Sequence, residues 1–392
     1  MLSFRIPGNI VYGEEAINYL TQLKGKKAML VTGGSSMKRS GFLDKAADLL
    51  KEAGMEVALF DGVEPDPSIK TVFQGTKAMQ EFNPEWIVAI GGGSAIDAAK
   101  AMWVFYEHPE LAFPQIVEPF SIPQLRNKAK FVAIPSTSGT ATEVTAFTVI
   151  TDSDTPNSLK YPLVSYEIIP DVAIVDPNLT VTMPSRVTAY TGMDALTHAI
   201  EAYVSTANSI FTDPLALEAI RTICSYLPKA FDNGENKEAR AKMHYAQCLA
   251  GMAFTNALLG IVHSMAHKIG AQFHIPHGEA NAMLLPYVVQ YNAKNALARY
   301  ADIARAVGIN DSDPSEAVKK LVEFIKDLNR RVGIPVSLSE YNVPEDEFFA
   351  VIDETSQNAL NDPCTGTNPR RPVAEEIKQI YTAAFFGKNV EV

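Results

Sequence analysis

Four of the chain's seven histidines lie in one short stretch, GIVHSMAHKIGAQFHIPHGEANA, at residues 260–282. They are His263, His267, His274 and His277. His263 and His267 are four residues apart, so on a helix they share one face, one turn apart. Upstream, in TGMDALTHAIEAY, Asp194 and His198 have the same spacing. If the two helices pack together, one carboxylate and several imidazoles meet, and such a set without thiolates is typical of a zinc or ferrous iron site.

Each of these residues taken singly can also be structural. An HxxxH pair is often a coincidence, or its two rings have nitrogens that bond to the backbone. A structural role of this kind is also enough to account for the single residues His108 and His244. However, a buried imidazole or carboxylate without a partner costs about 1 to 3 kcal/mol, and metal coordination removes that cost. Two such pairs inside otherwise apolar helices therefore favour a metal site. We expect His277 to lie in a turn, where Pro276 and Gly278 end the preceding helix.

A run of three glycines separates an apolar strand from a helix in IVAIGGGSAIDAAKAMW. We expect the helix to begin near Ser94, where backbone N–H groups at its positive end could bind a phosphate. The spacing is not the GxGxxG of the usual dinucleotide fingerprint, and a need for glycine's conformational freedom explains the run as well. A second polar turn, IPSTSGTATEVT, follows the strand at 130–135. Two turns at the carboxyl ends of parallel strands are where an extended nucleotide lies, so together they favour nucleotide binding.

A third turn, VTGGSSMKRSG, closes the first apolar strand. A cofactor without a 2′-phosphate is commonly bound through its ribose hydroxyls by an acidic side chain, whereas a 2′-phosphate needs small residues, hydroxyls and positive charge. The turn offers Gly33, Gly34, Ser35 and Ser36, with Lys38 and Arg39 behind them. It contains no carboxylate, which favours NADP(H) over NAD(H), although a solvated basic loop would have the same composition.

The elements that would position these residues alternate through the first half of the chain. The expected strands are 26–33, 56–62, 85–92, 130–135 and 171–176, separated by amphipathic runs. Strands that are apolar throughout are buried on both faces, which is typical of a parallel sheet covered by helices. From Ser185 on, apolar residues recur at helical spacing instead. We therefore predict a Rossmann-like α/β domain at residues 1–184 and an all-α domain at residues 185–392.

Composition limits the partners and the location of the protein. The 392 residues are 47% hydrophobic, enough for two domains. The net charge of −11 repels phosphate backbones and anionic membranes, so we expect no nucleic acid and no membrane as partners. The N-terminus does not resemble a signal peptide. Three single cysteines, Cys224, Cys248 and Cys364, suit a reducing compartment, which makes the cytoplasm the expected location.

Five motifs together, GGGSAIDAAK, PSTSGTATEVT, TGMDALTHAIEAY, GIVHSMAH and HIPHG, resemble those of the iron-containing (group III) alcohol dehydrogenases. They occur in that family's order and spacing, and the likeness runs from IPGNIVYG near the start to NDPCTGTNPR near the end. The chain is most similar to the bacterial NADPH-dependent butanol dehydrogenases, which have a similar GGxSMKR turn. Gly33 stands where NAD-using members of the family have Asp, which agrees with the preference for NADP(H).

The resemblance implies a dehydroquinate synthase-like fold, with the cofactor in the first domain, the metal in the second and catalysis between them. The implied metal ligands, for Fe²⁺ or alternatively Zn²⁺, are Asp194, His198, His263 and His277. His267 would be the proton relay, and Phe254 and His274 would line the substrate pocket. The implied cofactor-binding residues are Gly92, Gly93, Ser94, Asp97, Thr137, Ser138 and Lys160. Members of the family are commonly dimers, so we expect a homodimer.

The implied activity is reversible, metal-dependent hydride transfer between a short-chain primary alcohol, such as butanol or ethanol, and NADP⁺. A polyol or diol dehydrogenase acting on glycerol or 1,3-propanediol is the alternative within the fold. A metal-dependent lyase or hydrolase is a more remote one. Phe147 and Phe254 favour an apolar pocket and hence the short-chain alcohol. A structural protein with incidental histidines would bind no stoichiometric metal.

Overall fold

The computed structural model describes residues 3–155 and 159–391 and divides into two compact units, Met1–Met183 and Pro184–Val392. Each unit is described by itself. The first unit contains a parallel sheet with helices, and the described residues of the second contain helices and no strand. The predicted fold class, an α/β part followed by an all-α part, is therefore confirmed.

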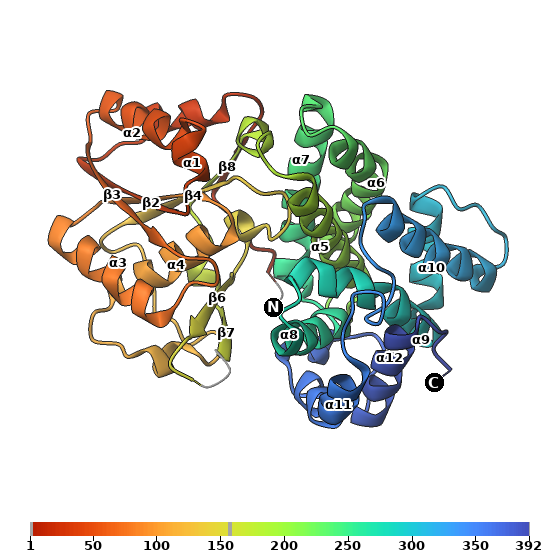
Figure 1. Ribbon diagram of the computed structural model, residues 1–392. Helices are drawn as coiled ribbons and strands as arrows, with labels where there is room; N and C mark the ends of the chain where they lie inside the picture. Colours follow the sequence, from red (N-terminus) through yellow and green to blue (C-terminus); the bar gives the residue numbers. More distant parts are fainter. Residues whose placement is uncertain (1–2, 156–158, 392) are drawn as a thin grey trace. The chain divides into compact units, whose positions relative to one another are not determined.

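A six-stranded sheet with the strand order β1-β8-β5-β4-β2-β3 forms the first unit (Figure 1). Its strands are β1 (Asn9–Tyr12), β2 (Lys27–Gly33), β3 (Glu56–Val63), β4 (Trp86–Gly91), β5 (Lys130–Pro135) and β8 (Val172–Val175). Each strand runs parallel to the neighbours with which it pairs. The carboxyl ends of these strands therefore meet at one edge of the sheet.

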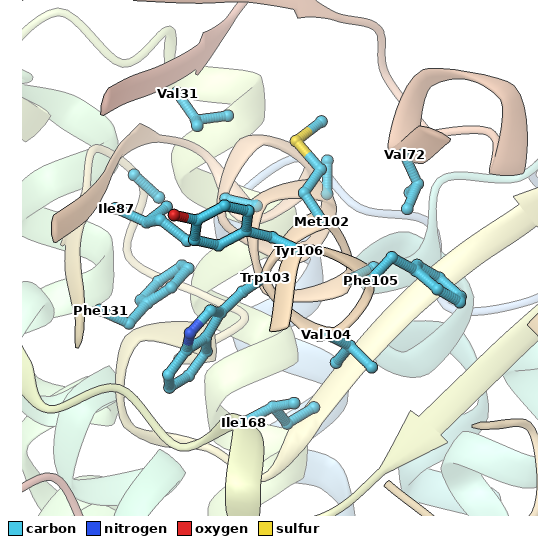
Figure 2. Close-up of a cluster of buried hydrophobic side chains, with 14 of the residues drawn as sticks. Val31, Val72, Ile87, Met102, Trp103, Val104, Phe105, Tyr106, Phe131 and Ile168 are labelled. Atoms are coloured by element: carbon cyan, nitrogen blue, oxygen red, sulfur yellow. The ribbon is translucent and has the colours of Figure 1, made fainter. Parts of the chain in front are cut away.

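The two faces of this sheet bury alternate residues of the inner strands, whereas the edge strands β1 and β3 are largely exposed or half-buried. On β4, Ile87 and Ala89 pack into one core and Val88 and Ile90 into the other. The covering helices are η1 (Ala16–Gln22) and α2 (Phe42–Glu52) on one face, and α3 (Ile69–Phe82) and α4 (Gly93–Glu107) on the other. Figure 2 shows the α3 and α4 side, where Trp103 packs near Phe131. Because both faces are covered, these strands are apolar throughout.

The winding of the sheet reverses between β2 and β4. From β2 the chain passes through α2 to β3 on one side, and it then returns through α3 to β4 on the other side of β2. The carboxyl ends of β2 and β4 thus flank a topological switch point, and β5 pairs with β4 next to it. Ligands of open parallel sheets bind at such points. The three polar turns expected to bind a cofactor follow β2, β4 and β5.

Two features of the first unit were not expected from the sequence. One is the edge strand β1, and the other is the antiparallel hairpin of β6 (Phe147–Asp152) and β7 (Leu159–Val164). The buried Lys100 of α4 anchors this hairpin, because its Nζ donates to the carbonyl oxygens of Thr145 and Phe147 at 2.8 and 2.9 Å. The remaining short helices are α1 (Ser36–Arg39), η2 (Phe113–Ile116), η3 (Thr142–Val144), η4 (Tyr166–Ile168) and η5 (Pro177–Thr180).

Helix α5 packs against α6, α7 and α9 in the second unit and is buried from Thr188 to Val204 at nearly every position. The helices are α5 (Ser185–Val204), α6 (Thr212–Asp232), α7 (Lys237–Ala257), α8 (Ile261–Phe273), α9 (His277–Ala306), α10 (Pro314–Arg331), α11 (Glu345–Leu360), η6 (Pro363–Thr367) and α12 (Ala374–Phe386). The hydroxyls of Thr188, Thr191 and Thr197 donate to carbonyl oxygens four residues earlier, so it is the buried titratable side chains of α5 that need partners from neighbouring elements.

Within the described residues, no helix taken singly is long and apolar enough to cross a membrane. Helices α7 and α8, which are bent by 106° relative to each other, meet the criterion of length and apolar composition only when they are taken together. More than half of the residues in each of these helices are buried in the second unit, as in the core helices of a globular domain.

Candidate functional site

Helix α5 carries three polar residues into the core of the second unit. Asp194, His198 and Glu201 follow one another at helical spacing, and they are only 3%, 5% and 3% exposed. A buried polar group without a partner destabilises the fold, so these side chains must be satisfied by α8, α9 or neighbouring loops. The burial of three polar side chains on one face of α5 is the first structural sign of a functional site.

Helix α9 brings His277 to Asp194. The sequence indicated that His277 lies in a turn, but it is the first residue of α9, because Pro276 has the φ of −52° and ψ of 136° of an N-cap. Gly278 lies inside α9, and a Cβ there would be 2.1 Å from the carbonyl oxygen of Tyr190 on α5. Glycine at this position therefore permits the close approach of α9 to α5 that places His277 beside Asp194.

Three of the four predicted ligands converge, since the ligand atoms of Asp194, His263 and His277 lie within 4.8 Å of one another. Asp194 Oδ1 is 3.4 Å from His277 Nε2 and 3.8 Å from His263 Nε2. Ligands bonded to one tetrahedral metal at about 2.1 Å are about 3.4 Å apart, so this spacing fits a metal ion. His198 stacks on His263 with ring centroids 4.6 Å apart. The four residues therefore gather in one place, and their role as ligands stays a prediction.

An amide that the sequence did not single out lies in the same cluster. Asn281 Nδ2 donates to Asp194 Oδ1 at 2.8 Å, and it is 3.1 Å from His277 Nε2 and 3.2 Å from His263 Nε2. Asn281 Oδ1 is buried without a hydrogen-bond partner among the described residues. Asn281 therefore orients the Asp194 carboxylate from a position one turn after His277.

His263 has the electrostatics of a metal ligand. Burial, followed by repulsion from three neighbouring imidazoles, lowers the pKa of His263 well below its usual value. The neutral ring is the form that binds metals. Its Nδ1 bonds to Glu201 Oε2. Burial raises the pKa of Glu201 to about 8, and backbone N–H groups at the start of α8 oppose that rise. A cation at Nε2 of His263 would favour the ionised carboxylate.

His267, one turn later on α8, pairs with a different carboxylate. Its Nδ1 is 3.1 Å from Asp362 Oδ2, and Lys268 Nζ is 2.9 Å from the same oxygen. Burial raises the pKa of Asp362, but hydrogen bonds and charge from His267 and Lys268 outweigh it and hold that pKa well below its usual value. Because Asp362 is ionised, His267 Nδ1 is the donor. The ring of His267 also stacks on that of His277, with centroids 5.3 Å apart.

A second set of ligand atoms includes His267. His267, Asp362 and Cys364 also have such atoms within 4.8 Å of one another. Two features oppose a cation there. Lys268 Nζ already occupies Asp362 Oδ2, and burial raises the pKa of the Cys364 thiol well above its usual value, whereas metals bind thiolates. The set around Asp194 has neither obstacle and is the better candidate.

Of the two residues predicted to line the substrate pocket, Phe254 is buried and His274 is exposed. Phe254 of α7 is 4% exposed and stacks on His198 with ring centroids 4.4 Å apart, so an apolar ring borders the ligand cluster. His274 is an exposed residue in the left-handed conformation, with a φ of 54°, that ends α8. Its conformation reverses the chain between α8 and α9, and its place in a pocket wall stays a prediction.

In the first unit, the turns after β4 and β5 pack against each other. Gly91 has a φ of 149°, which favours glycine, and Gly92 is the N-cap of α4. A Cβ on Gly92 would be 3.5 Å from the side chain of Thr137, and one on Gly93 would be 3.0 Å from that of Thr140. The first N–H groups of α4 and the polar loop after β5 are thus close together, an arrangement that suits a phosphate group.

Other residues predicted to bind the cofactor have protein partners or flank these turns. Ser94 is the second residue of α4, and Ser138 is buried in the loop after β5. The carboxylate of Asp97 accepts hydrogen bonds from Thr142 Oγ1 at 2.7 Å and from the Val149 N–H at 3.0 Å. The exposed Lys160 pairs with Asp66 at 2.7 Å. Asp97 therefore fixes the loop after β5, and the direct cofactor contacts of these residues stay predictions.

The turn after β2 requires its first glycine for a packing reason. A Cβ on Gly33 would be 2.4 Å from the carbonyl oxygen of Val63, so the approach of β3 demands glycine there whatever the cofactor. Exposed residues of this turn include Gly34, Ser35, Ser36, Lys38 and Arg39. The preference for NADP(H) is therefore supported by these exposed hydroxyls and cations rather than by Gly33.

Sequence reasoning missed three polar residues of the site, although each leaves a signal. Glu201 follows His198 by three residues on α5, and Asn281 follows His277 by four residues on α9. Asp362 belongs to NDPCTGTNPR, a motif to which no role was assigned. Helical spacing from a predicted ligand would have identified the first two.

Comparison with known sequences gives two family matches. Residues 7–177 match the profile of the iron-containing alcohol dehydrogenases, and residues 188–385 match the C-terminal profile of the Fe-containing alcohol dehydrogenase family. The chain is 58% identical over 391 residues to the NADPH-dependent butanol dehydrogenase of Clostridium saccharobutylicum, and the match covers 100% of both. It is 41% identical to an alcohol dehydrogenase of Thermococcus barophilus over 98% of this chain and 100% of that one.

Solved structures agree with the sequence matches. A 1,3-propanediol oxidoreductase superposes with a TM-score of 0.92 at 38% identity, covering 98% of this chain and 100% of that one. An iron-containing alcohol dehydrogenase of Thermococcus thioreducens superposes with a TM-score of 0.90 at 40% identity and the same coverage. The predicted dehydroquinate synthase-like fold is thereby confirmed.

Proposed function

We propose that this chain, which belongs to the iron-containing alcohol dehydrogenase family, transfers hydride reversibly between a short-chain primary alcohol and NADP⁺. In balanced form, R–CH₂OH and NADP⁺ give R–CHO, NADPH and a proton. The observation that carries the proposal is the convergence of the ligand atoms of Asp194, His263 and His277. The butanol dehydrogenase that is identical at 58% of positions supports the substrate class and the cofactor.

Iron would be held by Asp194, His198, His263 and His277. One carboxylate with neutral imidazoles suits Fe²⁺ and also Zn²⁺. When bound, the metal supplies a Lewis acid that withdraws electron density from the substrate oxygen. Asn281 keeps the Asp194 carboxylate turned toward the imidazoles through its hydrogen bond at 2.8 Å.

His267 is assigned to move the proton of the reaction at its Nε2 atom. Its Nδ1 donates to Asp362, so Nε2 has the lone pair that accepts the hydroxyl proton when the alcohol is oxidised. The same atom returns the proton when the aldehyde is reduced. Imidazole suits this task, because its charge changes near neutral pH.

The turns after β2, β4 and β5 are assigned to NADP(H), which when bound supplies the hydride acceptor or donor. N–H groups at the start of α4, near Gly93 and Ser94, would bind the pyrophosphate. The hydroxyls and cations of the β2 turn would bind the 2′-phosphate. Residues assigned to these contacts are Gly34, Ser35, Ser36, Lys38, Arg39, Gly92, Thr137 and Ser138.

A diol dehydrogenase is the second candidate, favoured by the likeness to a 1,3-propanediol oxidoreductase. The stacking of Phe254 on His198 favours an aliphatic chain instead, because it places an apolar ring at the ligand cluster. An apolar pocket discriminates one methylene by only about 1 to 3 kcal/mol, so alcohols that differ by one methylene would both react.

Two further proposals concern location and assembly. None of the three cysteines forms a disulfide in the structure, as is usual in a reducing compartment, and this supports a cytoplasmic protein. The homodimer rests on the family resemblance alone, and light scattering of the purified protein would test it.

The test is an anaerobic assay of the ferrous-loaded protein with butyraldehyde, comparing the oxidation of NADPH and NADH. We expect a strong preference for NADPH. Ser35→Asp should reduce the preference for NADPH, because a carboxylate repels the 2′-phosphate. Ser35→Asn, whose side chain has the shape of Asp without its charge, should retain the preference. A preference for NADH in the wild type would contradict the cofactor assignment. Turnover of 1,3-propanediol with none of butyraldehyde would favour the second candidate.

A further inference from the structure

Glu201 makes contacts that the proposed reaction does not by itself require. It lies on α5 with 3% exposure. Its Oε1 accepts the Val262 N–H at 2.7 Å, and its Oε2 bonds to Nδ1 of His263. Both partners lie in the first turn of α8. One buried carboxylate thus contacts the start of a helix and the first predicted ligand on that helix.

The start of α8 is shaped to receive this carboxylate. The N-cap residue is Gly260, which has no side chain with which to cap the helix. A Cβ at Gly260 would be 2.8 Å from Glu201 Oε1 and 2.9 Å from Asn368 Oδ1, so glycine leaves room for both oxygens. Asn368 Oδ1 accepts the Ile261 N–H at 3.3 Å. Side chains from other elements therefore cap α8, and the helix dipole favours a negative group there.

The contacts of Glu201 determine which nitrogen of His263 carries the proton. The Val262 N–H can only donate to Oε1, and when a cation at Nε2 of His263 favours the ionised carboxylate, Oε2 can only accept from the ring. The proton then lies on Nδ1, which leaves the lone pair on Nε2, the atom that is 3.2 Å from Asn281 Nδ2 and 3.8 Å from Asp194 Oδ1 in the ligand cluster. A histidine that binds a metal through Nε2 needs this tautomer.

We propose that Glu201 is a positioning residue of the metal centre, which holds His263 in the Nδ1–H tautomer and in the orientation that presents Nε2 to the metal. The inference rests on the proposed metal centre and adds to it a carboxylate that contacts neither metal nor substrate. Because the same carboxylate caps α8, the position of the helix and the geometry of the ligand are fixed together. Loss of such an outer partner costs about 10- to 100-fold in metal affinity.

The test is the Zn²⁺ dissociation constant of the metal-free protein, measured by competition with a chromophoric chelator. Glu201→Gln keeps the size and one acceptor oxygen, but its amide can donate to Nδ1 and so favour the wrong tautomer. We expect about 10- to 100-fold weaker Zn²⁺ binding, an unchanged melting temperature of the metal-free protein, and a changed Nδ1 signal in ¹⁵N spectra of histidine-labelled, Zn²⁺-loaded protein.

The matched control is Asp176→Asn. Asp176 is a buried carboxylate of the first unit that accepts the backbone N–H groups of Ile17 and Asn178 at 3.2 and 3.1 Å. Its replacement should leave the Zn²⁺ constant unchanged. A wild type that retains no Zn²⁺, or a His263→Ala variant that binds it equally well, would refute the metal centre itself. That result is distinguishable from a failure of Glu201 alone.

Equal Zn²⁺ affinity in wild type and Glu201→Gln would overturn the proposal. If Glu201→Gln does not fold, Glu201→Asp is measured in the same way, because it keeps the charge but withdraws it by one methylene. Weaker Zn²⁺ binding by a folded Glu201→Asp supports the positioning role. Unchanged binding, or failure of both variants to fold without metal, would make the role of Glu201 purely structural.

Discussion

His263 and His267 lie one turn apart on α8, and each has its Nδ1 against a buried carboxylate, but their surroundings differ. The side chain of His263 is 1% exposed and that of His267 is 29% exposed. The carboxylate beside His267, Asp362, also pairs with Lys268 at 2.9 Å, whereas Glu201 beside His263 receives backbone N–H groups.

These surroundings suit two different tasks. A metal ligand must stay neutral, and burial lowers the pKa of His263 to that end. A proton carrier must gain and lose charge and exchange protons with water, which a partly exposed ring can do. The pKa of Asp362 is held well below its usual value, so it stays ionised and accepts the Nδ1–H of His267. We therefore assign the ligand role to His263 and the relay role to His267.

The largest expected effect is that of His263→Ala. Losing a ligand from the centre of the cluster should reduce bound iron from about one ion per chain to below about a tenth, and turnover should fall with it. Elemental analysis after gel filtration, together with the anaerobic assay, measures both. Full activity in a metal-depleted His263→Ala preparation would refute the ligand assignment.

His267→Ala should separate the two histidines most clearly. We expect this variant to keep its iron and to lose about 10²- to 10⁴-fold in kcat, the usual contribution of a general acid or base. Metal content and kcat are measured on the same preparation. If the iron is lost instead, His267 is itself a ligand and the contrast between the two rings disappears.

Asp362→Asn should have a smaller effect of the same kind. The amide can still bond to Nδ1 of His267 but no longer stabilises positive charge, so kcat should fall by about 10-fold or more with metal content and KM unchanged. Lys268→Met, which removes the cation and leaves the carboxylate, is the matched control and should change kcat less. A fall in metal content in Asp362→Asn would favour the second set of ligand atoms, around Cys364.

His244→Gln should affect stability rather than the site. Burial lowers the pKa of His244 to about 3, so between pH 6.5 and that value the unfolded chain binds a proton that the folded one does not. Stability is therefore lost as the pH falls through this window, by about 1.4 kcal/mol per pH unit. Urea unfolding of the metal-free protein at pH 6.5 and pH 5 should show a flatter dependence in His244→Gln. An unchanged slope would mean that His244 is protonated in the fold.

Sequence periodicity predicted the buried strands because β2, β4, β5 and β8 are apolar throughout, a pattern typical of a parallel sheet that is covered on both faces. It did not predict the β6 and β7 hairpin, whose position depends on Lys100 of α4, 45 residues before Thr145 in the chain. The spacing of four residues likewise predicted that Asp194 and His198 share one face of a helix, and both lie on α5.

Contacts between distant segments were not predictable from spacing. Gly278 is needed because α9 approaches the Tyr190 carbonyl oxygen, and Gly33 because β3 approaches β2 at Val63. Asp362 reaches His267 across 95 residues of sequence. In each case the residue type is explained by a partner that only the fold brings near.

The roles assigned to these side chains depend most on where the metal binds. A crystal structure of the iron-loaded protein, with anomalous diffraction measured on both sides of the iron absorption edge, would locate it directly. We predict one iron peak bonded to Asp194, His198, His263 and His277, with Glu201 on Nδ1 of His263 and no metal bond to His267. A peak bonded to His267, Asp362 and Cys364, or no stoichiometric peak at all, would contradict these assignments.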